Sequence, residues 1–419
     1  MRFAVKATSG GGNGKARAGV LQGWGSFQHS VETPALLLST RKGLPSFITP
    51  TSSRLYRSRT RASFTSALST CESIACPPHG PCCSLYTTHG MPFIKNHFEH
   101  GGLRQMLGLP EHLFVSVGRD SIDSLPVIEG TNKLGASFET PSGRLLVRPE
   151  KYMEIISSLK PNLWATLADE VPAWAVEKRN KASVERTIRW LDECIALDPV
   201  CDLGAVVGGS SLEERSRCAK EVAKRNVSGY WIGGFGLGES MEERPALLNA
   251  VVDNLPEEKL RYVSGLGLPE EILEGVAAGI DLFDSTYIYH LTLGGLALVF
   301  PLDTVDKSRR SPFDFPPSSA VNDGTKINLS STIYRKDKSP ILEGCGCFTC
   351  RNHTRAYINH LLNVHEMLAQ ILLEIHNTHH YLGFFRSIRR AIGCGTFDMF
   401  RQSFIESRRE LFVSSMTCS

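Results

Sequence analysis

Short apolar runs alternate with longer stretches of mixed polar and apolar residues from about residue 150 to residue 284. Each apolar run ends in glycine or an acidic residue, and the runs lie at residues 163–170, 203–209, 230–239, 261–270 and 279–284. The stretches that follow them are typical of helices: Ser240 suits a helix cap and Pro269 a first helical turn. Strands and helices that alternate every roughly 20 to 30 residues predict βαβ units and a parallel sheet.

The residues at the ends of these runs bear on the fold class. Glycines and acids at the carboxyl ends of strands are what a (β/α)8 TIM-like barrel places at its functional face. An open doubly wound sheet produces the same local pattern, so the repeat leaves that architecture open. The residues favour the barrel, and we expect an α/β fold of this kind with a smaller C-terminal subdomain.

A dense group of potential metal ligands defines that subdomain. The group consists of Cys345, Cys347, Cys350 and His376. Three thiolates and one imidazole are a complete tetrahedral set for Zn²⁺ and leave no open position for chemistry. Residues 354–362 and 366–374 look helical, so the metal would tie a cysteine loop to a helix end. His379 and His380 compete for the fourth position. The sequence therefore predicts one structural Zn²⁺ per chain, against the alternative of three buried thiols near a surface histidine.

The same patterns divide the chain into six parts. They are an N-terminal β region (1–50), an irregular Ser/Arg/Cys-rich insertion (51–88), the barrel body (89–302), a linker (303–325), the zinc-binding subdomain with closing helices (326–395) and a C-terminal tail (396–419). Segment 51–88 has the composition of a disordered insertion, although its arginines would also suit an RNA-contact loop. The longest apolar run, 287–302, is too short to span a bilayer, and we expect a buried barrel strand and its neighbour there.

The bulk composition bears on the class of protein and on what it could bind. The 419 residues are 42% hydrophobic and 21% charged, which is ordinary for a globular protein. A net charge of +3 gives no strong field for nucleic acid, so an RNA contact would need a local basic patch. The chain has twelve cysteines, and its first residues lack the apolar run of a secretory signal. We therefore expect reduced thiols in the cytosol, and any membrane association would be peripheral.

Several separated motifs occur in one order along the chain. They are Gly-Gly-Phe-Gly-Leu-Gly-Glu at 233–239, Gly-Ile-Asp-Leu-Phe-Asp at 279–284, the cysteine loop, Thr-Arg-Ala-Tyr at 354–357, and a helix end from Glu-Met-Leu to His-Asn at 366–377. Together they resemble the tRNA-guanine transglycosylases, or queuine tRNA-ribosyltransferases, over roughly residues 135–395. The resemblance implies an irregular (β/α)8 barrel with a zinc-bearing insertion. It also implies exchange of the wobble guanine of certain tRNAs for queuine or its precursor.

The resemblance assigns roles to four residues. In this family one carboxylate attacks the ribose anomeric carbon, and a second manages protons on the leaving and arriving bases. Asp284 matches the nucleophile, Asp169 matches a purine-reading aspartate, and Gly233 and Gly234 match the backbone that lies against the base. Each also has a structural alternative. Asp284 would suit a strand end that binds backbone amides, Asp169 a helix cap, and the glycines close packing.

The departures from the family point away from catalysis. Catalytic chains carry an Asp-Ser-Gly-Gly-Tyr/Phe-Gln run with the proton-handling aspartate, whereas residues 114–122 have lost the glycines and the glutamine. Val207 replaces a purine-reading glutamine, and residues 287–289 replace Pro-Thr-Arg. A missing hydrogen bond in a buried site costs about 1–3 kcal/mol. This pattern resembles the non-catalytic accessory subunits of eukaryotic members, so we expect no catalytic residue and a vestigial nucleophile at Asp284.

The sequence leaves three possible functions to compare. The first is an accessory subunit in queuosine synthesis that holds tRNA and a catalytic partner in register as a heterodimer. The second is a transglycosylase that uses Asp284 by itself, which the missing second carboxylate argues against. The third is a zinc-dependent hydrolase, which four protein ligands argue against. The resemblance further implies the cytoplasm, with peripheral attachment to the mitochondrial outer membrane as a second location.

Overall fold

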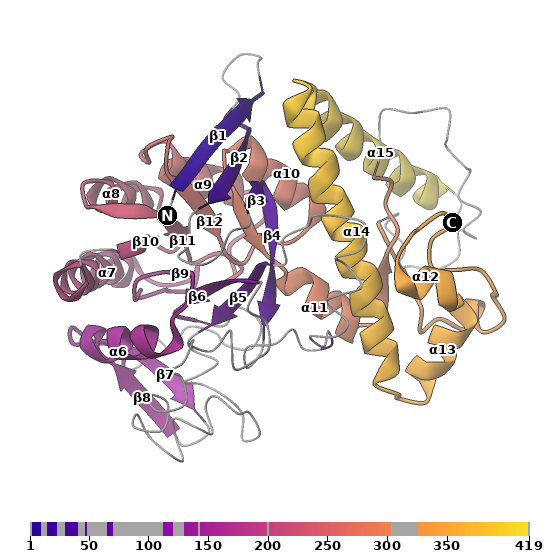
Figure 1. The fold of residues 1–419 in the computed structure, drawn as a ribbon, viewed down its shortest axis with the longest axis horizontal. Helices are drawn as coiled ribbons and strands as arrows, with labels where there is room; N and C mark the ends of the chain where they lie inside the picture. Colours follow the sequence, from indigo (N-terminus) through magenta and orange to yellow (C-terminus); the bar gives the residue numbers. More distant parts are fainter. Residues whose placement is uncertain are drawn as a thin grey trace. The chain divides into compact units, whose positions relative to one another are not determined.

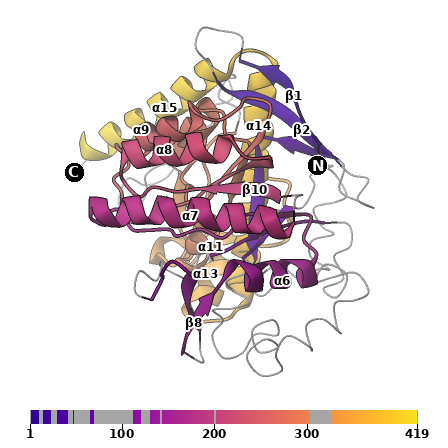
Figure 2. The same cartoon turned by 90° about the vertical axis from the view of Figure 1, so that its left-hand side faces the viewer.

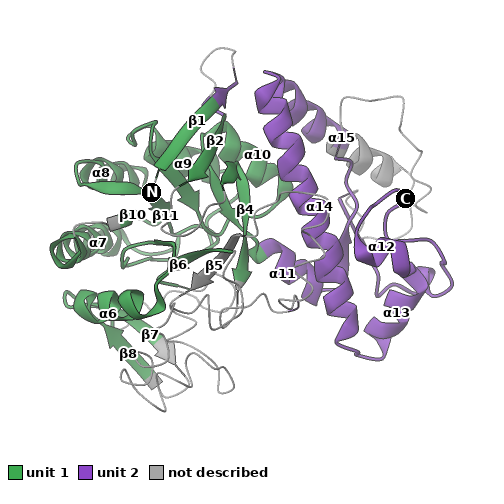
Figure 3. Ribbon diagram, in the orientation of Figure 1, with its two compact units in different colours: residues 1–6, 17–46, 63–286 green, residues 7–16, 47–62, 287–419 purple. Residues whose placement is uncertain are grey.

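The computed structural model forms two compact units, which are coloured separately in Figure 3. Unit 1 draws on residues 1–6, 17–46 and 63–286, and unit 2 on residues 7–16, 47–62 and 287–419. The structure describes residues 2–9, 15–22, 30–40, 47, 65–69, 112–119, 130–140, 143–198, 201–302 and 325–417.

A parallel eight-stranded sheet forms the centre of unit 1 (Figure 1). Its strands in sheet order are β10 (Cys201–Val206), β11 (Val227–Ile232), β12 (Leu260–Val263), β13 (Leu282–Asp284), β4 (Ala35–Thr40), β5 (Thr65–Ser69), β6 (Leu113–Val117) and β9 (Leu163–Trp164). All seven neighbouring pairs are parallel. A parallel bridge also pairs Ala165, directly after β9, with Leu203 of β10, and the amide of Thr166 donates to the Leu203 carbonyl at 2.9 Å.

Helices separate consecutive strands in the second half of unit 1. They are α6 (Pro149–Leu159), α7 (Glu177–Leu197), α8 (Leu212–Ala223), α9 (Arg244–Val252) and α10 (Pro269–Ala277). In Figures 1 and 2, α6, α7 and α8 lie side by side along one flank of the sheet. Pro269 is the first residue of α10, and the Ser240 hydroxyl accepts from the Glu243 amide just before α9. The predicted α/β class with a parallel sheet is therefore confirmed.

The strands carry apolar side chains because both faces of a parallel sheet are covered. Leu113, Leu203, Trp231 and Leu282 are all at most 2% exposed and belong to one core cluster. Two small sheets flank the main one. They are β1 (Arg2–Thr8), β2 (Arg17–Gln22) and β3 (Val31–Thr33), and the hairpin of β7 (Ala136–Thr140) and β8 (Gly143–Val147).

A buried ion pair fixes the start of β2 to the main sheet. Nε and Nη2 of Arg17 donate to the two carboxylate oxygens of Asp281 at 2.9 and 2.6 Å, just before β13. Arg17 also donates to the carbonyls of Glu257 and Lys259, ahead of β12. These contacts lie at the amino ends of the strands, opposite to the end where the functional residues of such sheets lie.

Unit 2 is mainly helical. Its elements are α11 (Thr286–Leu293), the antiparallel pair β14 (Leu296–Leu298) and β15 (Lys326–Asn328), the 3-10 turn η4 (Thr332–Tyr334), α12 (Phe348–Asn352), α13 (Arg355–Asn363), α14 (Leu368–Gly393) and α15 (Phe397–Thr417). A second core cluster includes Val299, Ile327, Ile358 and Leu372. None of the helices within the described ranges is long and apolar enough to cross a membrane.

The structure corrects two expectations about local elements. The apolar run 287–302 is not a barrel strand with its neighbour: it forms most of α11 and then β14, which belong to unit 2 except for Thr286. Gly295, at φ +68°, lies at the turn between them, and an apolar run of this length does not by itself distinguish helix from strand. Segment 51–88 contributes β5, because the ladders of β4 and β6 supply partners that its weak local pattern does not reveal.

Other expected parts fall partly outside the described residues. The rest of segment 51–88 and residues 303–324 of the expected linker lie there. The expected tail at 396–419 carries the helix α15 through Thr417.

Candidate functional site

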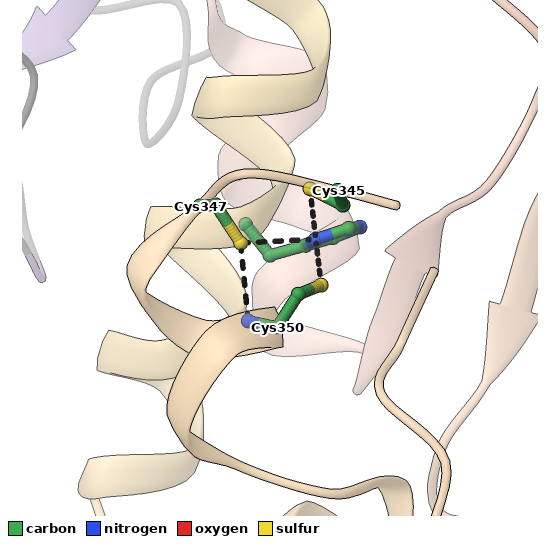
Figure 4. A group of neighbouring side chains, drawn as sticks. Cys345, Cys347 and Cys350 are labelled. Atoms are coloured by element: carbon green, nitrogen blue, oxygen red, sulfur yellow. Dashed lines mark hydrogen bonds between the residues drawn. The ribbon is translucent and has the colours of Figure 1, made fainter. Parts of the chain in front are cut away.

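Four potential metal ligands converge in unit 2 (Figure 4). They are Cys345, Cys347, Cys350 and His376, and their ligand atoms all lie within 4.8 Å of one another. Nδ1 of His376 lies 3.9, 3.6 and 3.3 Å from the three Sγ atoms, taken in chain order. A tetrahedral Zn²⁺ with bonds of about 2.0–2.3 Å would hold nitrogen and sulfur ligands about 3.5 Å apart. The donor set and its spacing therefore fit a tetrahedral metal ion.

The orientation of His376 supports the same interpretation. Its Nε2 lies 2.8 Å from the carbonyl oxygen of Leu298, and a carbonyl only accepts, so Nε2 carries the proton. Nδ1 then directs its lone pair toward the sulfurs, as in metal sites where a backbone carbonyl fixes the ligand tautomer. Burial by itself lowers the pKa of His376, but the sulfurs of Cys345 and Cys347 raise it to about 9. The sulfurs thus favour positive charge at this place, which is a proton on Nδ1 or, where Nδ1 acts as a ligand, a metal ion instead of that proton.

The cysteine loop owes its shape to a short helix start. Cys347 is the N-cap of α12, and its sulfur accepts from the Cys350 amide at 3.2 Å. This turn brings the second and third sulfurs of the C-x-C-x₂-C motif to one side. The Thr349 hydroxyl then donates to the Leu372 carbonyl at 2.7 Å, which fixes α12 against the first half of α14.

The connection between the cysteines and His376 differs from the expected helix-end arrangement. Two helices fill the gap, because α13 ends at Asn363 and the chain turns through His365, at φ +58°, before α14 begins. His376 is the ninth residue of the 26-residue α14, so the cysteine loop lies beside the body of that helix.

The competing histidines take other places. His380 is 1% exposed, and its ring packs edge-on against Phe300 with centroids 4.6 Å apart. Burial, with His376 nearby, lowers the pKa of His380 to about 3, so it is a neutral core residue. Neither His379 nor His380 belongs to the ligand cluster found among the described residues.

Asp284 lies at the carboxyl end of β13 and is 2% exposed. Its carboxylate accepts from the amides of Gly265 at 2.9 Å and Thr286 at 3.2 Å. Burial raises the pKa of Asp284, although these two amides oppose the shift. No cation lies within salt-bridge distance of this carboxylate in the part of the chain that the structure describes. Asp284 therefore makes the amide contacts of the structural alternative and also sits at the strand end that the nucleophile position requires.

Asp169 is held by two arginines of α7. Arg179 donates two hydrogen bonds to its carboxylate, at 2.7 and 2.6 Å, and Arg186 donates a third at 3.0 Å. Its carbonyl accepts from the Ser183 hydroxyl, and its amide donates to the Thr187 hydroxyl oxygen at 3.0 Å. The carboxylate of Asp169 is 2% exposed, so these contacts account for its charge within the protein.

Glu170 and Arg119 form a second ion pair at this end of the sheet, which the sequence analysis missed. Arg119 follows β6 directly, and its Nε and Nη2 donate to the Glu170 carboxylate at 2.6 and 3.0 Å. Burial raises the pKa of Glu170, but Arg119 and the Gly234 amide outweigh it, so the pKa lies below its usual value. The signal in the sequence was an arginine in the stretch where catalytic chains have glycines. The neighbouring Asp120 lies outside the described residues.

Gly233 and Gly234 follow β11 and have the conformation that glycine allows. Gly234 has φ +74°, and its amide donates to Glu170 at 2.7 Å. A Cβ atom on Gly233 would lie 3.0 Å from the Glu170 carboxylate. Arg215, which is fully buried, donates to the carbonyls of both glycines at 3.2 and 2.8 Å. These contacts are those of the structural alternative, close packing against charged side chains.

Comparison with known proteins agrees with these motifs. A family model described as queuine tRNA-ribosyltransferase matches residues 13–410. The chain therefore belongs to the queuine tRNA-ribosyltransferase family. Among similar curated proteins is the queuine tRNA-ribosyltransferase accessory subunit 2 of Xenopus tropicalis, which is 34% identical over 94% of this chain and 97% of its own length.

Two further relatives carry the same name. The human protein is 34% identical over 75% of this chain and 86% of its own length. The protein of Trichoplax adhaerens is 30% identical over 86% of this chain and 89% of its own length. The resemblance found from the motifs is thus confirmed for most of the chain.

Proposed function

We propose that this chain is the non-catalytic accessory subunit of a queuine tRNA-ribosyltransferase heterodimer, in which the partner exchanges the wobble guanine of tRNA for queuine. Family membership and the names of the relatives support this function. One structural observation carries the non-catalytic part. Asp169 and Glu170 follow β9 at the same end of the sheet as Asp284, and the carboxylates of both are bound by arginines. A carboxylate fixed in an ion pair is poorly suited to exchange protons with a base.

An exchange assay tests this proposal. The purified chain alone should show no incorporation of labelled guanine into tRNA and no covalent tRNA adduct, whereas the complex with a catalytic subunit should be active. Loss of general acid–base help alone costs about 10²–10⁴-fold in rate. In the heterodimer, Asp284→Asn should leave activity nearly unchanged, and the matching change in the partner should abolish it. Exchange by the chain alone that is lost in Asp284→Asn would establish the alternative, an active transglycosylase with Asp284 as nucleophile.

The four-residue cluster has a structural role in this proposal. Cys345, Cys347, Cys350 and His376 would hold one Zn²⁺, which would join the cysteine loop to α14 and leave no position open for substrate. The spacing of the donor atoms and the protonated Nε2 of His376 support this assignment.

The closed barrel is also part of the proposal. The eight strands are parallel, and their sheet order follows the chain from β4 to β13 when β9 and β10 are taken as neighbours. The bridge between Ala165 and Leu203 supports that neighbourhood, and β13 already pairs with β4. An eight-stranded ring of this kind is a (β/α)8 barrel, with Asp284, Glu170 and Gly234 at its carboxyl face.

An aromatic patch beside the cysteine loop is the surface that we assign to the catalytic partner. Phe348 and Tyr357 are 41% and 39% exposed, and the His353 ring lies between them. The His353 and Tyr357 rings are stacked with centroids 5.3 Å apart, and Phe348 lies 5.7 Å from His353. Exposed aromatic groups of this kind are enriched where protein partners dock.

The patch is tested by Tyr357→Ala. This variant should keep the melting temperature of the isolated chain and weaken the 1:1 complex by about tenfold or more, measured by calorimetric titration with the catalytic subunit. Trp174→Ala is the matched control, since it removes a 68% exposed aromatic residue of unit 1. Equal weakening by both variants would contradict the assignment of this surface.

A further inference from the structure

Arg119 brings a buried positive charge into the site, and the proposed function does not explain its purpose. The residue is 8% exposed and lies in the stretch whose glycines are lost relative to catalytic chains. Arg119 contacts Glu170, which follows the neighbouring strand β9. The two residues meet because β6 and β9 pair in the sheet. Burial raises the pKa of Asp284, and the charge of Arg119 is one of the groups that oppose this rise. The guanidinium thus stands among groups from three strand ends.

The partner of Arg119 lies directly against the two glycines. Oε1 of Glu170 accepts from both Arg119, at 3.0 Å, and the Gly234 amide, at 2.7 Å. The same oxygen would lie 3.0 Å from a Cβ atom on Gly233. The ion pair therefore fills the space in front of the backbone that, in catalytic relatives, lies against the base.

We propose that Arg119 and Glu170 form an internal plug that occupies the base position in front of Gly233 and Gly234 and excludes a purine from it. This inference rests on the proposed function, because the family resemblance makes these glycines the base position. An entering base would have to separate a bidentate ion pair whose side chains are only 9% and 4% exposed. Separating two opposite charges inside the protein without hydrating them is strongly unfavourable.

The test is to remove the plug and measure guanine binding. The double variant Arg119→Ala/Glu170→Gln deletes the guanidinium and keeps an oxygen that accepts from Gly234. Equilibrium dialysis with radiolabelled guanine should show no retention by the wild-type chain. The double variant should retain about one guanine per chain, with at least about tenfold tighter binding than the wild type. Arg119→Ser, which keeps Glu170, removes the guanidinium alone; this variant is less stable than the wild type, and its folded form should bind guanine as well.

Two controls separate a plug from general loosening. Arg17→Ala/Asp281→Asn removes an equally buried bidentate pair at the amino ends of the strands and should retain no guanine. Arg119→Met keeps most of the side-chain volume and should still exclude guanine. Circular dichroism and the melting transition show which variants are folded.

The outcomes are distinct from those for the proposed function. Guanine binding by the wild type, by Arg119→Met or by the control pair would overturn the plug, and so would a folded opened variant that stays empty. None of these results affects the accessory role, which fails only if the wild-type chain exchanges guanine in tRNA by itself.

Discussion

The cysteine–histidine cluster of unit 2 and the carboxylates of unit 1 are both groups of buried or half-buried polar side chains, but they differ in the groups that they contact. In the cluster, three sulfurs and one ring nitrogen face one another, with all four ligand atoms within 4.8 Å. At the strand ends, the carboxylates of Asp169 and Glu170 are bound by arginines of the same chain. Three converging thiols and an imidazole nitrogen can hold a metal ion, whereas arginines already bind the two carboxylates.

This difference bears on which of the two sites is suited to bind a ligand. A set of residues keeps the ability to bind when its donor atoms converge and lack internal partners. It loses that ability when arginines of the same chain already bind those donor atoms. The presence of acidic residues at strand ends is therefore a weaker sign of function than the identity of the groups that face them.

The largest effect is expected from breaking the cluster. Cys347→Ser should lower the zinc content from one ion per chain to well below one. It should also lower the melting temperature by on the order of 10 °C, because a structural metal site contributes its binding free energy to folding. Metal analysis by mass spectrometry and calorimetry measure both quantities. Cys394→Ser is the matched control, since this exposed thiol lies outside the cluster and should change neither. Full zinc content in Cys347→Ser would disprove the ligand assignment.

The second effect concerns Glu170 when Arg119 is removed alone. Arg119→Ala leaves a buried carboxylate without its cation, which destabilises a protein by about 3–5 kcal/mol. In the wild type the native pKa of Glu170 is lowered, so its contribution to stability is present above the unfolded pKa and is lost as pH falls. Without Arg119, burial dominates and raises the native pKa, so the variant loses stability as pH rises.

Urea unfolding at pH 7.5 and pH 5 measures this difference. The gap between wild type and Arg119→Ala should be larger at pH 7.5, and Arg119→Ala/Glu170→Gln should remove most of the pH dependence. A gap that is the same at both pH values would mean that Glu170 keeps its charge by another contact.

The sequence allowed the cluster to be predicted because its information is local. The spacing Cys345, Cys347, Cys350 places three sulfurs on one turn, and the fourth donor has few candidates nearby. The sequence could not choose between His376 and His380 by spacing, since both lie on one side of α14. The choice depends on Leu298, whose carbonyl fixes the His376 ring from β14, 78 residues away in the chain.

The partners of the carboxylates could not be predicted in the same way. Arg119 and Glu170 lie 51 residues apart and meet only because β6 and β9 are neighbours in the sheet. Arg179 meets Asp169 because α7 folds back beside the strand end. The repeat of strands and helices revealed the α/β class. It did not reveal α11, since one apolar run of 287–302 suits a helix as well as a strand.

A smaller effect on stability is expected from a substitution that tests whether His376 or His380 is the fourth ligand. His380→Phe should keep one zinc per chain and change the free energy of unfolding by about 1 kcal/mol or less, because a ring of similar shape keeps the contact with Phe300. His376→Phe should lose the zinc. Zinc analysis of the two purified variants compares them directly. Retention of zinc in His376→Phe together with its loss in His380→Phe would reverse the assignment.

The smallest effect concerns Asp284, the carboxylate at these strand ends with no cation in contact among the described residues. Burial raises its native pKa, so the wild type loses stability as pH rises through that value, whereas Asp284→Asn has no proton to lose. At pH 4 the two proteins should be equally stable, because a protonated aspartate and an asparagine each keep one carbonyl oxygen that accepts from the amides of Gly265 and Thr286. At pH 8 the variant should be more stable by on the order of 1 kcal/mol, measured by urea unfolding. A wild type that is instead the more stable protein at pH 8 would mean that a cation pairs with Asp284, and the contrast between this carboxylate and its two arginine-bound neighbours would then disappear.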